Sequence, residues 1–159
     1  MRRILVALDG SECAFRAVEY CGLQFAGVTD LAVTLLHVLP SLPPRFWDEG
    51  HMLSEEEREA RRRLVEEWLA RQKASVEPIF LRAEAMLEQK DIQEAQVETK
   101  IVYDSTDVAA TILEEARARP YLTLVLGRCG FSPLRTPLLG STTSRIINRG
   151  AGLAVCVVE

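Results

Sequence analysis

Short apolar runs alternate with amphipathic stretches along this chain of 159 residues. Runs rich in β-branched and aliphatic residues are typical of strands that are buried on both faces of a parallel sheet. They predict strands at Ile4–Asp9, Leu31–Val38, Val97–Tyr103, Leu122–Leu126 and Leu153–Val158. The third run alternates apolar with polar residues, which favours a position at the edge of the sheet.

Helices are predicted between these strands, from apolar residues that are spaced three and four positions apart. The first helix begins after the N-cap residue Ser11 and ends at Gly27. Thr106 or Ser105 is expected to cap a later helix. A short last helix is expected between the fourth and fifth strands.

The strongest helix pattern covers Ser54–Lys73. Ser54 and Glu57 have the spacing of a capping box, which satisfies free N–H groups at the start of a helix. Pro78 is expected to break or kink this element, so that a second helical piece covers Ile79–Gln89. The apolar stripe of the first piece is Leu64, Val65, Trp68 and Leu69.

The alternation of strands and helices predicts an α/β fold, a doubly wound parallel sheet of five strands with helices on both faces. The length suits one domain over residues 1–159. Ligands of such sheets bind at the carboxyl ends of the strands, where the strand order reverses. If the first and fourth strands are neighbours there, Asp9–Ser11 and Gly127–Gly130 share one crevice. Leu31–Val38 ends on the same side and could form the wall for a base.

The segment Leu122–Thr143 predicts an anion pocket, because a strand is followed by a glycine-containing loop and then by the start of a helix. Glycines let the backbone approach a phosphate closely. The N–H groups in the first turn of the helix supply hydrogen-bond donors and a partial positive charge. We therefore predict a nucleotide phosphate site in this segment.

Four stretches resemble the pattern of the universal stress protein family, in the expected order and over nearly the whole chain. They read ILVALDGSE, VTLLHV, VETKIV and GRCG-FSPLRTPLL-GST. In the last stretch Gly127, two residues, Gly130, nine residues, Gly140 and Ser141 match the ATP-binding signature of that family. The resemblance implies a sheet of strand order 3-2-1-4-5 and an adenine nucleotide across the first and fourth strands.

The nucleotide implied by the resemblance is ATP, with AMP or ADP as alternatives, and Mg²⁺ as a possible companion. Asp9 would contact the ribose or the adenine, and the backbone of Val38 the edge of the adenine. Two places depart from the usual pattern. Arg128 and Cys129 stand between the first two glycines, and Arg128 could reach a phosphate or crowd the sugar. Tyr103-Asp104-Ser105-Thr106 follows the third strand, where Asp104 could cap the next helix or place a negative charge at the pocket mouth. The residues expected at the site are Ala7, Leu8, Asp9, Val38, Leu126, Gly127, Arg128, Gly130, Gly140, Ser141, Thr142 and Thr143.

The resemblance also implies a homodimer that pairs the edge strand Leu153–Val158 of two copies. The formal net charge of −4 argues against broad binding to nucleic acids or anionic membranes. No apolar run approaches the ~20 residues that cross a bilayer, and a cytoplasmic location is expected. The four cysteines form no CxxC pair, so we expect reduced thiols that bind no metal. A redox-sensor role for Cys129 is the alternative to an ordinary loop residue.

Catalysis has little support, because the chain has no P-loop GKS/T and no acid besides Asp9 that is suited to Mg²⁺. The function expected is that of a nucleotide-sensing, dimeric regulatory protein of the stress response, with at most slow ATP hydrolysis. The alternatives are an adenylating enzyme on the same fold and a structural dimer that binds no nucleotide. His37 is expected to be a satisfied core or near-pocket histidine, and His51 to be exposed. Trp47 and Phe46 are expected to pack over the sheet end or the long helix, or to form a lid.

Overall fold

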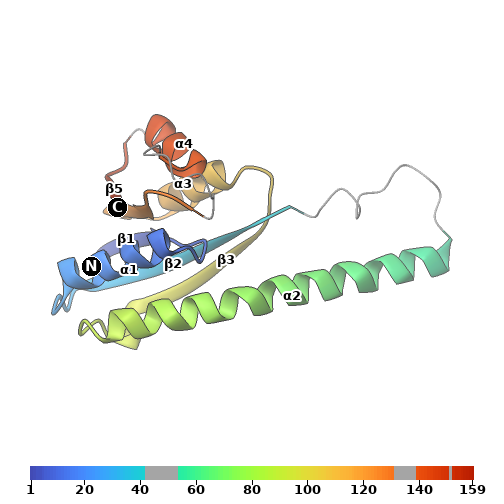
Figure 1. The fold of residues 1–159 in the computed structure, drawn as a ribbon, viewed down its shortest axis with the longest axis horizontal. Coiled ribbons are helices and arrows are strands. Elements are labelled where there is room, and N and C mark those ends of the chain that lie inside the picture. The colour runs from blue at the N-terminus through green and yellow to red at the C-terminus, as the bar shows by residue number, and fades with distance from the viewer. Residues whose placement is uncertain (42–53, 131–138, 151) are drawn as a thin grey trace.

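The structure is a computed structural model that describes residues 1–41, 54–130, 139–150 and 152–159. Its strands form one five-stranded, all-parallel sheet of order β3-β2-β1-β4-β5, which confirms the predicted fold (Figure 1). In chain order the elements are β1 (Arg2–Ala7), α1 (Glu12–Phe25), β2 (Leu31–Pro40), α2 (Glu55–Glu88), a 3-10 turn (Glu94–Gln96), β3 (Val97–Ser105), α3 (Val108–Ala118), β4 (Thr123–Gly127), α4 (Ser141–Arg149) and β5 (Val155–Val158). His51, Trp47 and Phe46 lie outside the described residues.

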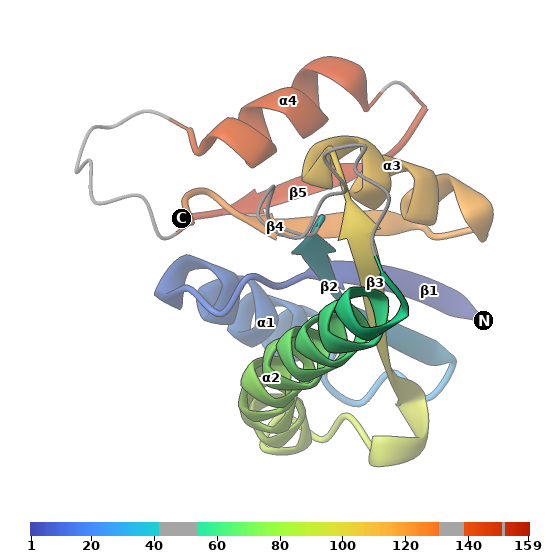
Figure 2. The same cartoon turned by 90° about the vertical axis from the view of Figure 1, so that its right-hand side faces the viewer.

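The helices cover both faces of the sheet, as Figure 2 shows. Side chains in a strand point alternately to opposite faces, so neighbouring residues of β1 enter different cores. Ile4 and Val6 pack with α1 and with the C-terminal half of α2, whereas Leu5 and Ala7 pack with α3 and with Ile146 of α4. This two-sided burial explains why the strands are continuous apolar runs.

The central strands β1 and β4 are hydrogen-bonded neighbours, and Ile4 pairs with Thr123. Because the two strands are parallel, their carboxyl ends reach the same edge of the sheet. The turn that follows β1 and the glycine loop that follows β4 are therefore placed side by side. This adjacency makes a shared site possible.

The start of α3 differs from the prediction. Asp107 is its N-cap and accepts a hydrogen bond from the backbone N–H of Ala110 at 3.1 Å, so neither Ser105 nor Thr106 caps the helix. The reason is that β3 continues to Ser105, which moves the first helical turn towards the C-terminus. The Asp107 carboxylate also pairs with Arg145 of α4, which joins the two helices.

The predicted break at Pro78 is wrong, because α2 is a single helix of 34 residues. Proline removes the hydrogen bond to the carbonyl of Ala74 and its ring crowds that carbonyl, but both residues lie on the exposed face of the helix. The buried residues on either side of Pro78 maintain the helix against the sheet. They are Val76, Phe80, Ala83 and Leu87.

The N-terminal half of α2 projects past the ends of the strands (Figure 1). The capping box at its start is confirmed: Ser54 Oγ accepts from Glu57 N at 3.2 Å, and Glu57 Oε2 accepts from Ser54 N at 2.8 Å. The predicted apolar stripe is only partly buried, since Trp68 is covered whereas Leu64 is 52% exposed. The residues that α2 buries therefore lie further towards the C-terminus than the predicted stripe. Within the described segments, none of the helices has both the length and the apolar character needed to cross a membrane.

Candidate functional site

A cavity of about 340 Å³ lies at the carboxyl ends of β1, β2 and β4, and the starts of α3 and α4 close its sides. Every residue predicted for the site contributes to its wall except Arg128. The walls also include residues that the sequence analysis did not assign to it, namely Ala14, Leu36, Val108, Ile112 and Cys129. The structure therefore brings most of the predicted residues together around one cavity, and the additional residues come from α1, β2, α3 and the glycine loop.

One side of the cavity is apolar. Leu36 and Val38 alternate along β2 and face it together, and Val108 and Ile112 face it from α3. The spacing of four between Val108 and Ile112 is the sequence signal that places both residues on one face of α3. Such a wall excludes water and suits a flat, weakly polar group such as a base.

Asp9 lies at the mouth of the cavity, on the turn that leads from β1 to α1. Its Oδ1 accepts a hydrogen bond from Ser11 N at 2.9 Å, and Gly10 adopts a positive φ of 88° that lets the chain reverse. Ser11 then caps α1 by accepting from Ala14 N at 3.2 Å, as predicted. The other carboxylate oxygen faces Gly130, because a β-carbon added to Gly130 would lie 2.6 Å from Oδ2. Asp9 thus presents one oxygen towards the glycine loop.

Hydrogen bonds join the two glycine-containing parts of the signature. Gly140 N donates to the carbonyl of Arg128 at 2.9 Å, and Thr143 Oγ1 donates to the carbonyl of Gly127 at 2.9 Å. Gly140 is the N-cap of α4 and, having no side chain, leaves the N–H groups of the first turn uncapped by any side chain. The helix start therefore offers donors and a partial positive charge to the cavity.

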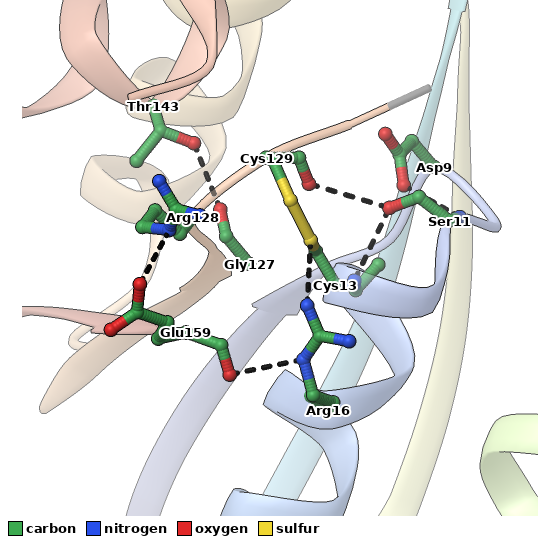
Figure 3. Close-up of a disulfide and its surroundings, with 10 residues drawn as sticks. Asp9, Ser11, Cys13, Arg16, Gly127, Arg128, Cys129, Thr143 and Glu159 are labelled. Carbon is green, nitrogen blue, oxygen red and sulfur yellow. Dashed lines mark hydrogen bonds and ion pairs between the residues drawn. A yellow bond between two sulfur atoms is a disulfide. The ribbon is translucent and has the colours of Figure 1, made fainter. Parts of the chain in front are cut away.

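The side chain of Arg128 does not reach the cavity. Its Nε lies 3.1 Å from Oε1 of Glu159, beyond β5 (Figure 3). Asp104 also lies elsewhere: it adopts a positive φ of 60° and lines a separate groove with Pro40 and Trp68. The structure therefore shows neither of the two roles considered for Arg128. It also shows neither of the two roles considered for Asp104.

The expectation that all cysteines are free is wrong, because Cys13 and Cys129 form a disulfide (Figure 3). Their Cα atoms are 5.7 Å apart although 116 positions separate them in the sequence. Short-range spacing gave no signal for this pair, since only the adjacency of β1 and β4 brings the two loops together. Cys21 and Cys156 are free. Burial, together with the nearby Cys156, raises the pKa of the Cys21 thiol to about 12.

His37 is buried on β2, as expected, and burial lowers its pKa against the opposing effects of a hydrogen bond with the Leu8 backbone and of the Asp9 charge. Its Nδ1 has no hydrogen-bond partner in the part of the chain that the structure describes, so the expectation of a satisfied histidine is wrong there. Leu35 and Leu39, its neighbours on the same face of β2, belong to the core beneath α1 and α2. His37 consequently lies on the face opposite Leu36 and Val38.

No set of three His, Cys, Asp or Glu side chains converges as a metal site within residues 1–41, 54–130, 139–150 and 152–159. Asp9 is the only ionisable side chain that lines the cavity there, apart from the disulfide-bonded Cys129. The site offers shape, backbone donors and hydroxyl groups rather than a cluster of charges.

Comparison with known proteins gives a family and a fold. The model of the universal stress protein family matches residues 1–152. The solved structure of the hypothetical protein MJ0577 is similar, with a TM-score of 0.75 and 22% identity, and the match covers 99% of this chain and 94% of that chain. Among curated proteins, none is significantly similar in sequence to this chain.

Two further solved structures of similar fold are complexes with nucleotides. A universal stress protein in complex with cAMP has a TM-score of 0.64 and 18% identity, and the match covers 99% of this chain and 96% of that chain. The universal stress protein from Archaeoglobus fulgidus in complex with dAMP has a TM-score of 0.61 and 18% identity, and the match covers 100% of this chain and 98% of that chain. At these identities the similarity establishes a common fold.

Proposed function

The chain belongs to the universal stress protein family, and from this premise we propose that it is a regulatory module that binds an adenine nucleotide, ATP in the first instance. The observation that carries the proposal is that one cavity is lined by both ends of the glycine signature and by Asp9 and Val38. Its volume of about 340 Å³ falls within the ~300–1,000 Å³ of typical small-molecule sites.

The adenine fits the apolar side of the cavity. Leu36, Val38 and Ile112 would contact its faces, and the backbone at Val38 would meet its polar edge. A base needs such a dry wall because its ring faces carry little hydrogen-bonding capacity. The cAMP and dAMP held by two relatives of the same fold have this base.

The phosphates fit the opposite end, between Gly130 and the start of α4. Ser141 and Thr142 line the cavity there, and the first turn of α4 has no side-chain cap that would compete for its N–H groups. The ribose would then lie near Asp9, whose free oxygen can accept hydrogen bonds from hydroxyl groups. Mg²⁺, if it accompanies ATP, would find the Asp9 carboxylate as its protein ligand.

A regulatory role is favoured over catalysis by the chemistry of the wall. Phosphoryl transfer needs cationic groups that neutralise the developing charge and a positioned nucleophile. Arg128, which lies in the glycine loop, is paired with Glu159. We therefore propose that occupancy changes the order of the loops, and that partner proteins of a stress response detect this change.

Calorimetric titration of the folded protein with ATP, ADP and AMP, with and without Mg²⁺, tests the proposal. We expect saturable binding, and we expect Gly140→Val to weaken it by about tenfold or more, because a branched side chain would press on the backbone of Arg128 and Cys129 and displace the loop that borders the phosphate space. Ser144→Val is the matched control, since Ser144 lies on α4 outside the cavity wall. Absence of binding at millimolar nucleotide would refute the proposal, and rapid release of AMP or pyrophosphate would favour the adenylating enzyme.

We also propose a homodimer that pairs Leu153–Val158 of two copies. Within the part of the chain that the structure describes, β5 pairs only with β4, so it is an edge strand. An unpaired edge presents N–H and C=O groups that a second strand can satisfy.

A further inference from the structure

We propose that Cys13 and Cys129 form a reversible thiol–disulfide switch that sets the affinity of the cavity for its nucleotide. The redox chemistry stands on the geometry of the two cysteines alone. The effect on affinity rests on the proposed function.

The fold places Cys13 and Cys129 next to each other. Cys13 lies in the first turn of α1, and Cys129 lies in the loop after β4, where it lines the cavity. Their Cα separation of 5.7 Å is ordinary for a native disulfide, so closing the bond requires no large backbone movement. The bond joins the two loops that border the proposed nucleotide site.

The surroundings of the two cysteines suit them to thiol chemistry. The guanidinium of Arg16 lies beside Cys13, with Nη2 3.0 Å from Sγ. Together with the positive end of α1, this cation favours the thiolate form of Cys13, which is the nucleophile in disulfide formation. Cys21 is the contrast, because burial raises its pKa to about 12. Cys129 is more accessible than the buried Cys13, so we assign the first encounter with an oxidant to Cys129.

The chemistry balances with a peroxide as the oxidant. The Cys129 thiol reacts with hydrogen peroxide to give a sulfenic acid and one water. The Cys13 thiolate then attacks that sulfur, the S–S bond forms, and hydroxide leaves and is protonated to a second water. The two thiols lose two electrons and the peroxide gains them. A dithiol reductant reverses the reaction through two exchange steps and is itself oxidised to a disulfide.

The disulfide also holds part of the cavity wall in place. In the disulfide form the 127–130 loop is held from two sides, by the bond to α1 and by the hydrogen bond from Gly140 to the Arg128 carbonyl. The Ser11 hydroxyl adds a long contact, donating to the Cys129 carbonyl at 3.4 Å. Without the bond the sulfur atoms must separate from about 2 Å to about 3.5–4 Å. The loop then loses its covalent link to α1 and is held by the hydrogen bonds alone, so the disulfide form is the pre-organised one and binds nucleotide more tightly.

The test uses the full chain in two states, one treated with hydrogen peroxide and one with dithiothreitol, with the reagent then removed. Alkylation after denaturation and peptide mass mapping should find two fewer free thiols in the oxidised state, a Cys13–Cys129 link, and recovery of both thiols on reduction. Titration with ATP should give about fivefold or greater tightening in the oxidised state. Cys129→Ser, or Cys13→Ser if the first folds poorly, should show one affinity under both treatments, whereas the control Cys156→Ser should respond like the parent chain.

Three outcomes would overturn the inference, and they differ in what they reject. Absence of the Cys13–Cys129 link after oxidation rejects the switch itself. A link that leaves the affinity for ATP unchanged rejects its regulatory effect. Absence of ATP binding in both states, with the link formed, rejects the proposed function and with it the control of affinity.

Discussion

Gly127 packs against the first turn of α1, where an added β-carbon would lie 2.6 Å from the backbone carbonyl atoms of Cys13. Gly130 meets only the flexible end of the Asp9 side chain at that distance. Backbone atoms cannot move aside cheaply, whereas a carboxylate can rotate. The two glycines of one motif therefore serve different purposes, packing for the first and room beside Asp9 for the second.

We expect Gly127→Ala to lower the free energy of unfolding by about 1–3 kcal/mol, because the new methyl group overpacks a backbone contact. Gly130→Ala should change stability by about 0.5 kcal/mol or less but weaken nucleotide binding, since it displaces the Asp9 carboxylate. Chemical denaturation and calorimetric titration of both variants check the two expectations. Equal losses of stability would contradict this division of roles.

At this scale the sequence indicated which residues border the cavity but not how their side chains are used. Gly127, Gly130 and Gly140 could be identified because their spacing belongs to a local motif. The pairing of Arg128 with Glu159 and of Cys13 with Cys129 could not, because each joins segments that only the fold brings together. Pairings between distant parts of the chain leave no periodic signal.

The helix α2 shows what a hydropathy pattern can and cannot predict for an element. Ser54 and Glu57 identified its start because a capping box is local chemistry. The extent of the core was not predictable, since apolar spacing gives the face of a helix but not how far the sheet beneath it extends. Leu64 has the correct spacing and nevertheless lies mostly exposed on the projecting half.

Since Pro78 lies within a continuous helix on its exposed face, we expect Pro78→Ala to raise the free energy of unfolding by about 1–2 kcal/mol. The alanine restores a hydrogen-bond donor and removes the steric conflict of the ring, which outweighs the greater entropy of the unfolded chain. Glu77→Ala, at the neighbouring exposed position, is the control and should stay within about 0.5 kcal/mol. Urea denaturation measures both. A destabilised Pro78→Ala would mean that the packing of Phe80 and Ala83 depends on the proline.

On the scale of the whole molecule, the alternation of strands and helices was sufficient to predict the parallel sheet and its doubly wound form. Crossover connections between parallel strands leave few alternatives once five apolar runs are identified. The strand order followed from the resemblance to a family, and the structure has that order. Whether the protein forms a dimer is a separate question. The backbone groups of β5 lead to a specific prediction about it.

The carbonyls of Ala154 and Val158 accept hydrogen bonds from the N–H groups of Leu124 in β4 and of Arg128 directly after it. In a parallel ladder the N–H and C=O of one residue point to the same side, so those of Val155 and Val157 point outward. Val157→Pro therefore removes an outward donor without breaking the pairing with β4. We expect light scattering to find a dimer for the parent chain and for Val157→Ala, and a monomer for Val157→Pro. A proline variant that remains dimeric would exclude pairing through this strand.

The central place of β1 in the sheet has a consequence for the order in which the molecule forms. Its first partner, β2, begins at Leu31, but its second partner begins only at Thr123. During synthesis one edge of this apolar strand therefore stays unpaired until most of the domain has been made. Nascent chains aggregate through unpaired strand edges. We therefore expect this protein to need chaperones until β4 has been synthesised.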